Sequence, residues 1–294
     1  MSDNKKGSMS LLKLGISNFE TIRRTRKRQQ DMLRRLRNAD IDPSHYAGLA
    51  DCTPDDCGRR NCAEACFFGA RRRRLEEIPA VVELLQKEEG PIYEVRIIRE
   101  SWERPVGQLE EFNIGAAKQL HRRALDKLYM PSLVAVGMCK VTLRTTGERR
   151  WIPEIHGIIA GAEKEDLEKI FLIHRRILGM EYNVFSAKEV SNIGQTVSRV
   201  LRRDLRKWVH PYGGSADPAP GKARRAEYYC WLLGLDRGER LIRYGCGRSF
   251  TALNKKPRVF QQKVYKKRPY PEHLVPYMFG RHPQNCKCGR CVPL

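Results

Sequence analysis

The sequence lacks any run of about 20 apolar residues, which is the length that an α-helix needs to cross a bilayer. Its first residues also lack the apolar core of a signal peptide, because the stretch at 11–16 is short and is interrupted by Lys13 and Gly15. These two absences argue against a membrane protein and against a secreted one. We therefore expect a cytoplasmic protein in which the ten cysteines are thiols or metal ligands rather than disulfides.

Acidic residues are scarce relative to basic ones. The 294 residues contain 34 Asp and Glu against 56 Lys and Arg, so the formal net charge is +22. Such an excess of one sign destabilises a compact chain by self-repulsion unless a polyanion neutralises it. Nucleic acid is the polyanion that a strongly basic protein most commonly binds. The composition therefore predicts a nucleic-acid-binding protein.

Basic residues gather in four segments. Residues 1–40 form a basic arm whose stretch at 19–38 predicts a mostly exposed helix with a thin apolar stripe. A block of four arginines follows at 71–74, and the helix predicted at 191–209 is also basic. In the tail at 255–294, cations alternate with aromatic rings, a pattern that suits stacking on the bases of a single strand. The residues that we predict to contact nucleic acid are Arg71, Arg72, Arg73, Arg74, Arg199, Arg202, Arg203, Arg206, Lys263, Lys266, Lys267 and Arg268.

Four cysteines in residues 41–75 have a spacing that suits a metal. Cys52, Cys57, Cys62 and Cys66 lie within fifteen residues, and four thiolates can close a tetrahedral zinc site. An iron–sulfur cluster would use the same ligands. A second group, His282, Cys286, Cys288 and Cys291, closes the tail with another set of zinc-ligand types. We predict small structural zinc modules near both ends of the chain.

Residues 76–254 alternate between helical and strand patterns, which predicts an α+β body with a central antiparallel sheet and flanking helices. Its centre is a hairpin at 132–161, in which two β-branched and apolar stretches flank a polar turn with Gly147. The other predicted strands lie at 92–98, 182–185 and 240–245, and the predicted helices lie at 75–88, 108–129, 163–178, 191–209 and 226–234.

The second strand of this hairpin carries Glu154 and His156. Because side chains alternate between the two faces of a strand, these two residues share one face. They can bind one divalent cation together, or they can bind each other.

The order of elements over residues 91–250 resembles that of the HUH endonucleases, the family of rolling-circle replication initiators and related insertion-element transposases. These proteins carry a His-hydrophobic-His motif on a central strand, and the segment from Trp151 to Ile159, Trp-Ile-Pro-Glu-Ile-His-Gly-Ile-Ile, is similar to that strand. The strand at 92–98, the helix at 108–129, Gly-Met-Cys-Lys-Val at 137–141 and the segment at 240–248 are similar in placement. The cysteine module ahead of the body is similar to the zinc module of some transposases in this family.

The resemblance implies a catalytic Mg²⁺ or Mn²⁺ held by Glu154 and His156, with a carboxylate in place of the first histidine of the motif. It also implies a tyrosine on a later helix that attacks the phosphate and becomes covalently linked to DNA. If that helix is the one at 226–234, the nucleophile is Tyr228 or Tyr229. If it is the one at 191–209, Arg199 stands in the place of the tyrosine, and the protein binds DNA without cutting it.

Three functions follow from these alternatives. The first is a replication initiator-like protein that nicks and rejoins single-stranded DNA at an origin or element end, with replication or transposition proteins as partners. The second is a catalytically degenerate relative, a zinc-stabilised nucleic-acid-binding protein without nuclease activity. The third is an RNA-binding protein that uses the basic tail and the cysteine modules.

Overall fold

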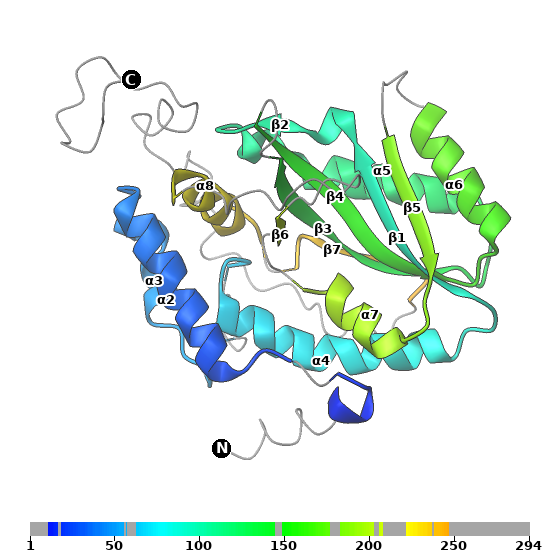
Figure 1. The fold of residues 1–294 in the computed structure, drawn as a ribbon, viewed down its shortest axis with the longest axis horizontal. Coiled ribbons are helices and arrows are strands. Elements are labelled where there is room, and N and C mark those ends of the chain that lie inside the picture. The colour runs from blue at the N-terminus through cyan, green and yellow to red at the C-terminus, as the bar shows by residue number, and fades with distance from the viewer. Residues whose placement is uncertain are drawn as a thin grey trace.

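The computed structural model describes residues 11–16, 19–55, 57, 63–144, 149–176, 183–202, 206–207, 222–236 and 238–246. They form one curved sheet with helices packed on both faces (Figure 1). The predicted α+β class with a central antiparallel sheet is confirmed. In the described part of the chain the sheet has seven strands, and its main path runs β5-β1-β4-β3-β6. Its one parallel pair is the short contact between β3 and β6 (Arg206–Lys207).

The predicted hairpin forms the centre of the sheet. Strands β3 (Val134–Arg144) and β4 (Arg150–Ala160) pair over their whole length, and nearly all of their residues are buried. Strand β1 (Ile92–Arg99) pairs with the other edge of β4 and, further out, with β5 (Asn183–Glu189). Strand β7 (Leu241–Tyr244) pairs with β3. Continuous burial on both faces explains why β3 and β4 are rich in β-branched residues.

Pro153 lies in the middle of β4, where a proline normally removes a hydrogen bond from the sheet. Pairing with β1 ends at Glu154, and pairing with the two-residue strand β2 (Arg104–Pro105) begins at Trp151. Pro153 therefore stands at the junction between two neighbouring strands, where its missing N–H is tolerated.

Two helical layers cover the sheet. On one face, α4 (Phe67–Gln86) and α7 (Ile193–Val200) pack against Val136, Met138 and Ile158. On the other face, α5 (Ile114–Asp126) and α6 (Lys164–Arg176) pack against Val95 and Ile159. Because side chains alternate along β4, residues 154, 156 and 158 face the α4–α7 layer, whereas residues 151, 155 and 159 face the opposite layer. This division decides which predicted site residues can meet.

The amino-terminal arm packs on the body. Helix α2 (Ile22–Asn38) buries Met32 and Leu36 in the same core as Trp151 and as Trp231 of α8 (Lys222–Leu233). Cysteines of the predicted 41–75 module belong to this core as well. The segments predicted as 1–40, 41–75 and 76–254 thus share one hydrophobic core over their described residues.

Several helix boundaries differ from the prediction: α5 begins at Ile114 rather than at 108 and α8 begins at Lys222 rather than at 226, and two further differences affect the site. Helix α4 begins at Phe67, well before the expected residue 75, so the arginine block at 71–74 lies inside a helix. Helix α7 ends at Val200, and Leu201 caps it, although a helix was predicted through residue 209. The shorter α7 leaves Arg199 in its last turn, directly above the sheet. Among the described helices, none is both long and apolar enough to span a bilayer.

Candidate functional site

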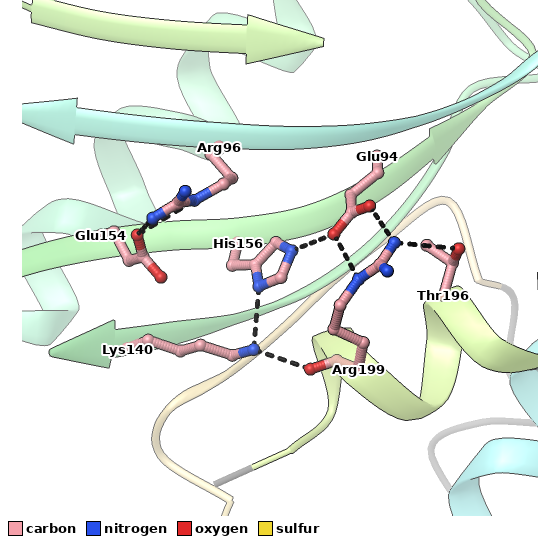
Figure 2. A network of polar contacts seen from close by, with 7 residues as sticks. All are labelled: Glu94, Arg96, Lys140, Glu154, His156, Thr196 and Arg199. Atoms are coloured by element: carbon pink, nitrogen blue, oxygen red, sulfur yellow. Dashed lines mark hydrogen bonds and ion pairs between the residues drawn. The ribbon is translucent and has the colours of Figure 1, made fainter. Parts of the chain in front are cut away.

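Five charged or polar side chains from three adjacent strands form a network on the α4–α7 face of the sheet (Figure 2). Glu94 and Arg96 come from β1, Lys140 from β3, and Glu154 and His156 from β4. The sheet register sets this grouping, because Lys140 is the cross-strand partner of Glu154 and Arg96 is that of His156. Lys140, Glu154 and His156 are at most 1% exposed. Buried charges are costly unless each has a partner, so their contacts decide what the site can do.

His156 uses both of its ring nitrogens within this network. Its Nδ1 lies 2.8 Å from Nζ of Lys140, and its Nε2 is hydrogen-bonded to Glu94. An ammonium group can only donate, so Nδ1 accepts from Lys140 and Nε2 carries the proton that is donated to the Glu94 carboxylate. The contacts therefore assign His156 as a neutral imidazole with a fixed tautomer.

Helix α7 supplies the remaining partners. Lys140 Nζ donates to the backbone carbonyl oxygen of Arg199 at 2.9 Å. The Arg199 guanidinium reaches back over the strands and forms a two-pronged ion pair with Glu94. It also donates to the Thr196 hydroxyl at 3.3 Å. One backbone atom and one side chain of Arg199 thus fix α7 to the charge network.

Glu154 is paired with Arg96 through Oε2, whereas its other oxygen, Oε1, is buried without a hydrogen-bond partner. Burial acts to raise the pKa of Glu154, but the positive charge and hydrogen bond of Arg96, together with the charge of Lys140, outweigh burial and lower it overall. Burial likewise acts to raise the pKa of Glu94, but hydrogen bonds from His156 and Arg199 lower it to about 2. Both carboxylates are therefore ionised at neutral pH.

This arrangement does not fit a divalent metal at Glu154 and His156. Lys140 already occupies Nδ1 of the imidazole, Glu94 accepts from Nε2, and Arg96 neutralises Glu154. An added dication would have to sit between two cationic side chains. The expectation of a catalytic Mg²⁺ or Mn²⁺ therefore gains no support from the geometry. In the part of the chain that the structure describes, the residues that converge as a possible metal site lie elsewhere and are Cys52, Cys57 and Cys66.

Neither of the tyrosines predicted as nucleophiles packs against Glu154 or His156. Tyr228 is 2% exposed and stacks on Trp151, whose side chain faces away from Glu154 and His156. Its hydroxyl lies 3.4 Å from Nη1 of Arg240, a fully buried arginine that also pairs with Glu64. Tyr229 packs edge-on against Phe67, and burial raises its pKa. The sheet therefore separates Tyr228 from the Glu154–His156 pair, Tyr229 packs against the start of α4 instead, and the α7 residue beside that pair is Arg199.

Three of the predicted zinc ligands do converge. The sulfur atoms of Cys52, Cys57 and Cys66 lie within 4.8 Å of one another, and Cys57 and Cys66 are buried. Zinc–sulfur bonds of about 2.3 Å in a tetrahedron place sulfurs roughly 3.8 Å apart, so the cluster can hold a metal ion such as zinc.

Neighbouring backbone and side-chain groups fix this cluster. Cys66 is the N-cap of α4 and accepts a hydrogen bond from the Gly69 N–H at 3.3 Å, an interaction that favours a thiolate. Gln29 of α2 accepts from the Phe67 N–H at 2.9 Å and donates to the Leu49 carbonyl at 3.0 Å, which ties α2 to both sides of the cluster.

The arginine block at 71–74 is engaged within the protein. Arg73 and Arg74 are buried, the first paired with Glu64 and the second hydrogen-bonded to Ser198. Arg71 donates to the carbonyl of Glu20, and Arg72 contacts Glu76 and the carbonyl of Cys57. In this conformation the buried pair, Arg73 and Arg74, face protein groups rather than solvent.

Arg202 is exposed just after α7, whereas Arg206 lies in β6. The other predicted site residues lie outside the described part of the chain; they are Cys62, Arg203, Lys263, Lys266, Lys267, Arg268, His282, Cys286, Cys288 and Cys291.

Sequence reasoning did not identify Glu94, Arg96 and Lys140 as site residues. A signal existed, because Glu94 and Arg96 are the polar positions of an alternating strand and Lys140 interrupts an apolar one. Their roles, however, depend on the register between strands, which no single strand pattern contains.

Comparisons with protein-family models, with curated proteins and with solved structures find no match to this chain.

Proposed function

We propose that this protein binds nucleic acid through a replication initiator-like α+β body and does not cut the strand that it binds. The observation that carries this proposal is that cationic side chains occupy the polar site on strands β1, β3 and β4. At the place where the resemblance implies a metal ion and a tyrosine, the chain has Lys140 on His156 and Arg199 on Glu94. Neither an ammonium group nor a guanidinium group forms the covalent phosphoester that nicking and rejoining require.

The solvent-facing side of α2 supports nucleic acid as the ligand. Its buried residues Thr25, Gln29, Met32 and Leu36 lie on one face. At 100° per residue, the exposed cations lie outside this face, on the opposite side and on both flanks of the helix, and they extend over about 21 Å. Arg34 of this set is paired with Asp31. The others have no acidic partner among the described residues, and they are Arg23, Arg24, Arg26, Lys27 and Arg37.

These unpaired cations are free to release counterions from a phosphate backbone, which is the sequence-independent part of nucleic-acid binding. The cysteine cluster fixes the region against which α2 packs, through Gln29 and the shared core. We infer that a structural zinc at Cys52, Cys57 and Cys66, with Cys62 as its fourth ligand, holds α2 in position to bind. Single-stranded DNA is the ligand that the resemblance favours.

The test combines a binding measurement with a cleavage measurement. Fluorescence anisotropy with labelled single-stranded DNA, duplex DNA and single-stranded RNA, repeated at several salt concentrations, gives both the preferred ligand and the number of phosphate contacts. The triple variant Arg23→Ala, Arg26→Ala, Arg37→Ala should reduce the slope of log affinity against log salt by roughly 2, at about 0.7 per contact for a single strand. A charge-matched control, Arg123→Ala, Lys127→Ala, Lys164→Ala, removes exposed cations from α5 and α6 on the other face of the sheet and should change the slope far less.

The cleavage arm uses end-labelled single-stranded DNA with Mn²⁺ and a denaturing gel. We expect salt-sensitive binding without a labelled protein band. A covalent band that disappears in the double variant Tyr228→Phe, Tyr229→Phe would contradict the proposal and favour the nicking enzyme. Preference for RNA over DNA would keep the non-cutting site but replace the proposed ligand. Absence of binding to all three ligands would overturn the proposal.

A further inference from the structure

The sulfur atoms of Cys57 and Cys66 lie closer together than a bound zinc ion would place them. Their separation is 3.1 Å, whereas the sulfur ligands of a tetrahedral zinc ion lie roughly 3.8 Å apart. The two sulfur atoms of a disulfide lie about 2.05 Å apart. The pair is therefore intermediate between these two bonding states, and a shift of about 1 Å would join its sulfur atoms covalently.

Both cysteines of this pair are fixed by nearby contacts. Cys66 is the N-cap of α4, and its sulfur accepts from the Gly69 N–H. The carbonyl oxygen of Cys57 accepts from Nη1 of Arg72 at 3.3 Å, and the Cys57 N–H donates to the Thr53 carbonyl at 3.0 Å. Because the fold already holds the two thiols side by side, a bond between them requires little further ordering.

The third cysteine of the cluster is the one that solvent can reach. Cys52 is partly exposed, whereas Cys57 and Cys66 are at most 1% exposed. The three sulfur atoms lie within 4.8 Å of one another, so oxidation at Cys52 can pass to the buried pair by thiol–disulfide exchange. Because oxidation of cysteine follows exposure, Cys52 is the thiol that an oxidant meets first.

We propose that the cluster is a modification site for hydrogen peroxide, at which Cys52 meets the oxidant and Cys57 and Cys66 end as a disulfide. The disulfide follows from the geometry of the cluster. Its consequence, release of the structural zinc, rests on the proposed function. The cluster then has two closed states, one joined by a metal ion and the other by a covalent bond.

The disulfide forms in three steps. The Cys52 thiolate attacks one peroxide oxygen, the O–O bond breaks and hydroxide leaves, which gives a sulfenic acid. Cys66 attacks the Cys52 sulfur and displaces hydroxide, so a Cys52–Cys66 disulfide forms. Cys57 then attacks the Cys66 sulfur and expels the Cys52 thiolate. In total, two thiols lose two electrons and two protons, and one hydrogen peroxide is reduced to two molecules of water.

Oxidation should expel a metal ion from the cluster, because metals bind the thiolate and a disulfide sulfur carries no such charge. Gln29 of α2 contacts the backbone at Leu49 and at Phe67, on the two sides of the cluster. Loss of the metal therefore acts on the region that positions α2.

The experiment maps disulfides in purified full-length protein after treatment with an equimolar amount of hydrogen peroxide. Remaining thiols are alkylated, and the protein is digested with trypsin and with the endoproteinase Asp-N. The sequence keeps the products distinct. Asp55 separates Cys52 from Cys57, and a second cleavage site, Arg59, separates Cys57 from Cys66. Fragment spectra then locate the linked sulfur within each peptide.

We expect the Cys57–Cys66 link as the main product in the wild type. Cys139 and Cys230 should stay reduced in the same digest, because both are buried outside the cluster. Cys52→Ser should slow the link by at least about tenfold, because the accessible thiol is gone. Cys57→Ser should block the exchange step and leave a Cys52–Cys66 link. Dithiothreitol should reverse the wild-type link, and a chromogenic chelator should detect one zinc ion released per link.

Wild-type protein in which Cys57 and Cys66 do not become linked would overturn the inference, and so would a link that forms no faster than modification of Cys139. Both readouts use the wild type, so they hold even where a variant fails to fold. An unchanged rate in folded Cys52→Ser would contradict the role of Cys52. A link without zinc release would support the disulfide and contradict the structural zinc. Nucleic acid is absent throughout, so these outcomes are independent of the anisotropy measurement.

Discussion

The cysteine cluster at the start of α4 and the charge network on β4 differ in how their ligand atoms are neutralised. In the cluster, three sulfur atoms converge within 4.8 Å of one another, at the amino-terminal end of a helix. In the network, each carboxylate has an arginine and the imidazole has a lysine. Both regions contain residues that bind metals, yet the network receives its cations from neighbouring strands and from α7. Metal-ligand residues therefore indicate a metal site only where the fold supplies no cation of its own.

The largest effect should come from breaking the cluster. Cys66→Ser removes a buried sulfur atom of the cluster at the N-cap of α4. With the proposed structural zinc bound there, it should lower the free energy of unfolding by more than about 4 kcal/mol, because a structural metal contributes directly to folding. Urea denaturation together with the metal content of the purified protein measures both parts. Chelator should destabilise the wild type in the same direction.

Cys246→Ala is the control for this change, because Cys246 is also buried but follows β7, far along the chain, and donates to the backbone carbonyls of Ala135 and Tyr244. It should cost about 1 kcal/mol. Equal stability of the two variants, with metal retained in Cys66→Ser, would remove the distinction between the two regions.

A smaller effect is expected from breaking the network at Glu154. Glu154→Gln keeps the shape of the side chain but leaves Arg96 without its carboxylate. Loss of one partner from a buried pair costs about 3–5 kcal/mol, and the 38% exposure of the Arg96 side chain reduces this to roughly 2–3 kcal/mol. Thermal or urea unfolding measures it.

The matched comparison for Glu154→Gln is Glu83→Gln, which breaks the exposed Lys87–Glu83 pair of α4. Solvent screens an exposed pair of this kind, so this variant should be close to the wild type. If the two variants lose equal stability, the network is not a set of buried, mutually neutralising charges.

The smallest effect is a pH dependence at Glu94. Its pKa is about 2 in the folded protein against 4.5 for an ordinary glutamate, because hydrogen bonds from His156 and Arg199 outweigh burial. A depressed pKa stabilises the fold fully above about pH 4.5, and this contribution is lost as the pH falls towards 2. The wild type should therefore exceed Glu94→Gln in stability at pH 7, and this advantage should shrink by about 1–2 kcal/mol at pH 3. An advantage that stays constant or grows on acidification would mean that Glu94 is not paired as described.

Most of the fold could be predicted from the sequence because its elements have clear local patterns. The hairpin at 132–161 follows from two β-branched stretches around a polar turn, and the strands at 92–98 and 240–245 follow from similar runs. The boundaries of α4 could not be predicted, because four consecutive arginines suggest an exposed segment and because a proline, Pro79, lies inside the helix. Tertiary contacts stabilise the helix in this region, because Arg73 and Arg74 are buried against Glu64 and Ser198.

The site was less predictable, because its chemistry depends on contacts between distant segments. The alternation of β4 correctly places Glu154 and His156 on one face, but Lys140 reaches His156 only through the β3–β4 register. Tyr228 and Arg199 were left as alternatives by the sequence, since a helical pattern does not tell which face of a sheet the helix covers. The cysteine spacing was more informative, because three of its four residues converge locally.

The most direct test of the account is anomalous diffraction from crystals of the wild-type protein soaked in Mn²⁺, with data collected at wavelengths that separate manganese from zinc. We predict a zinc peak among the sulfur atoms of Cys52, Cys57 and Cys66, and no manganese peak beside His156, where the Lys140 side chain should be seen instead. A manganese peak within bonding distance of His156 and Glu154, with Lys140 displaced, would contradict it.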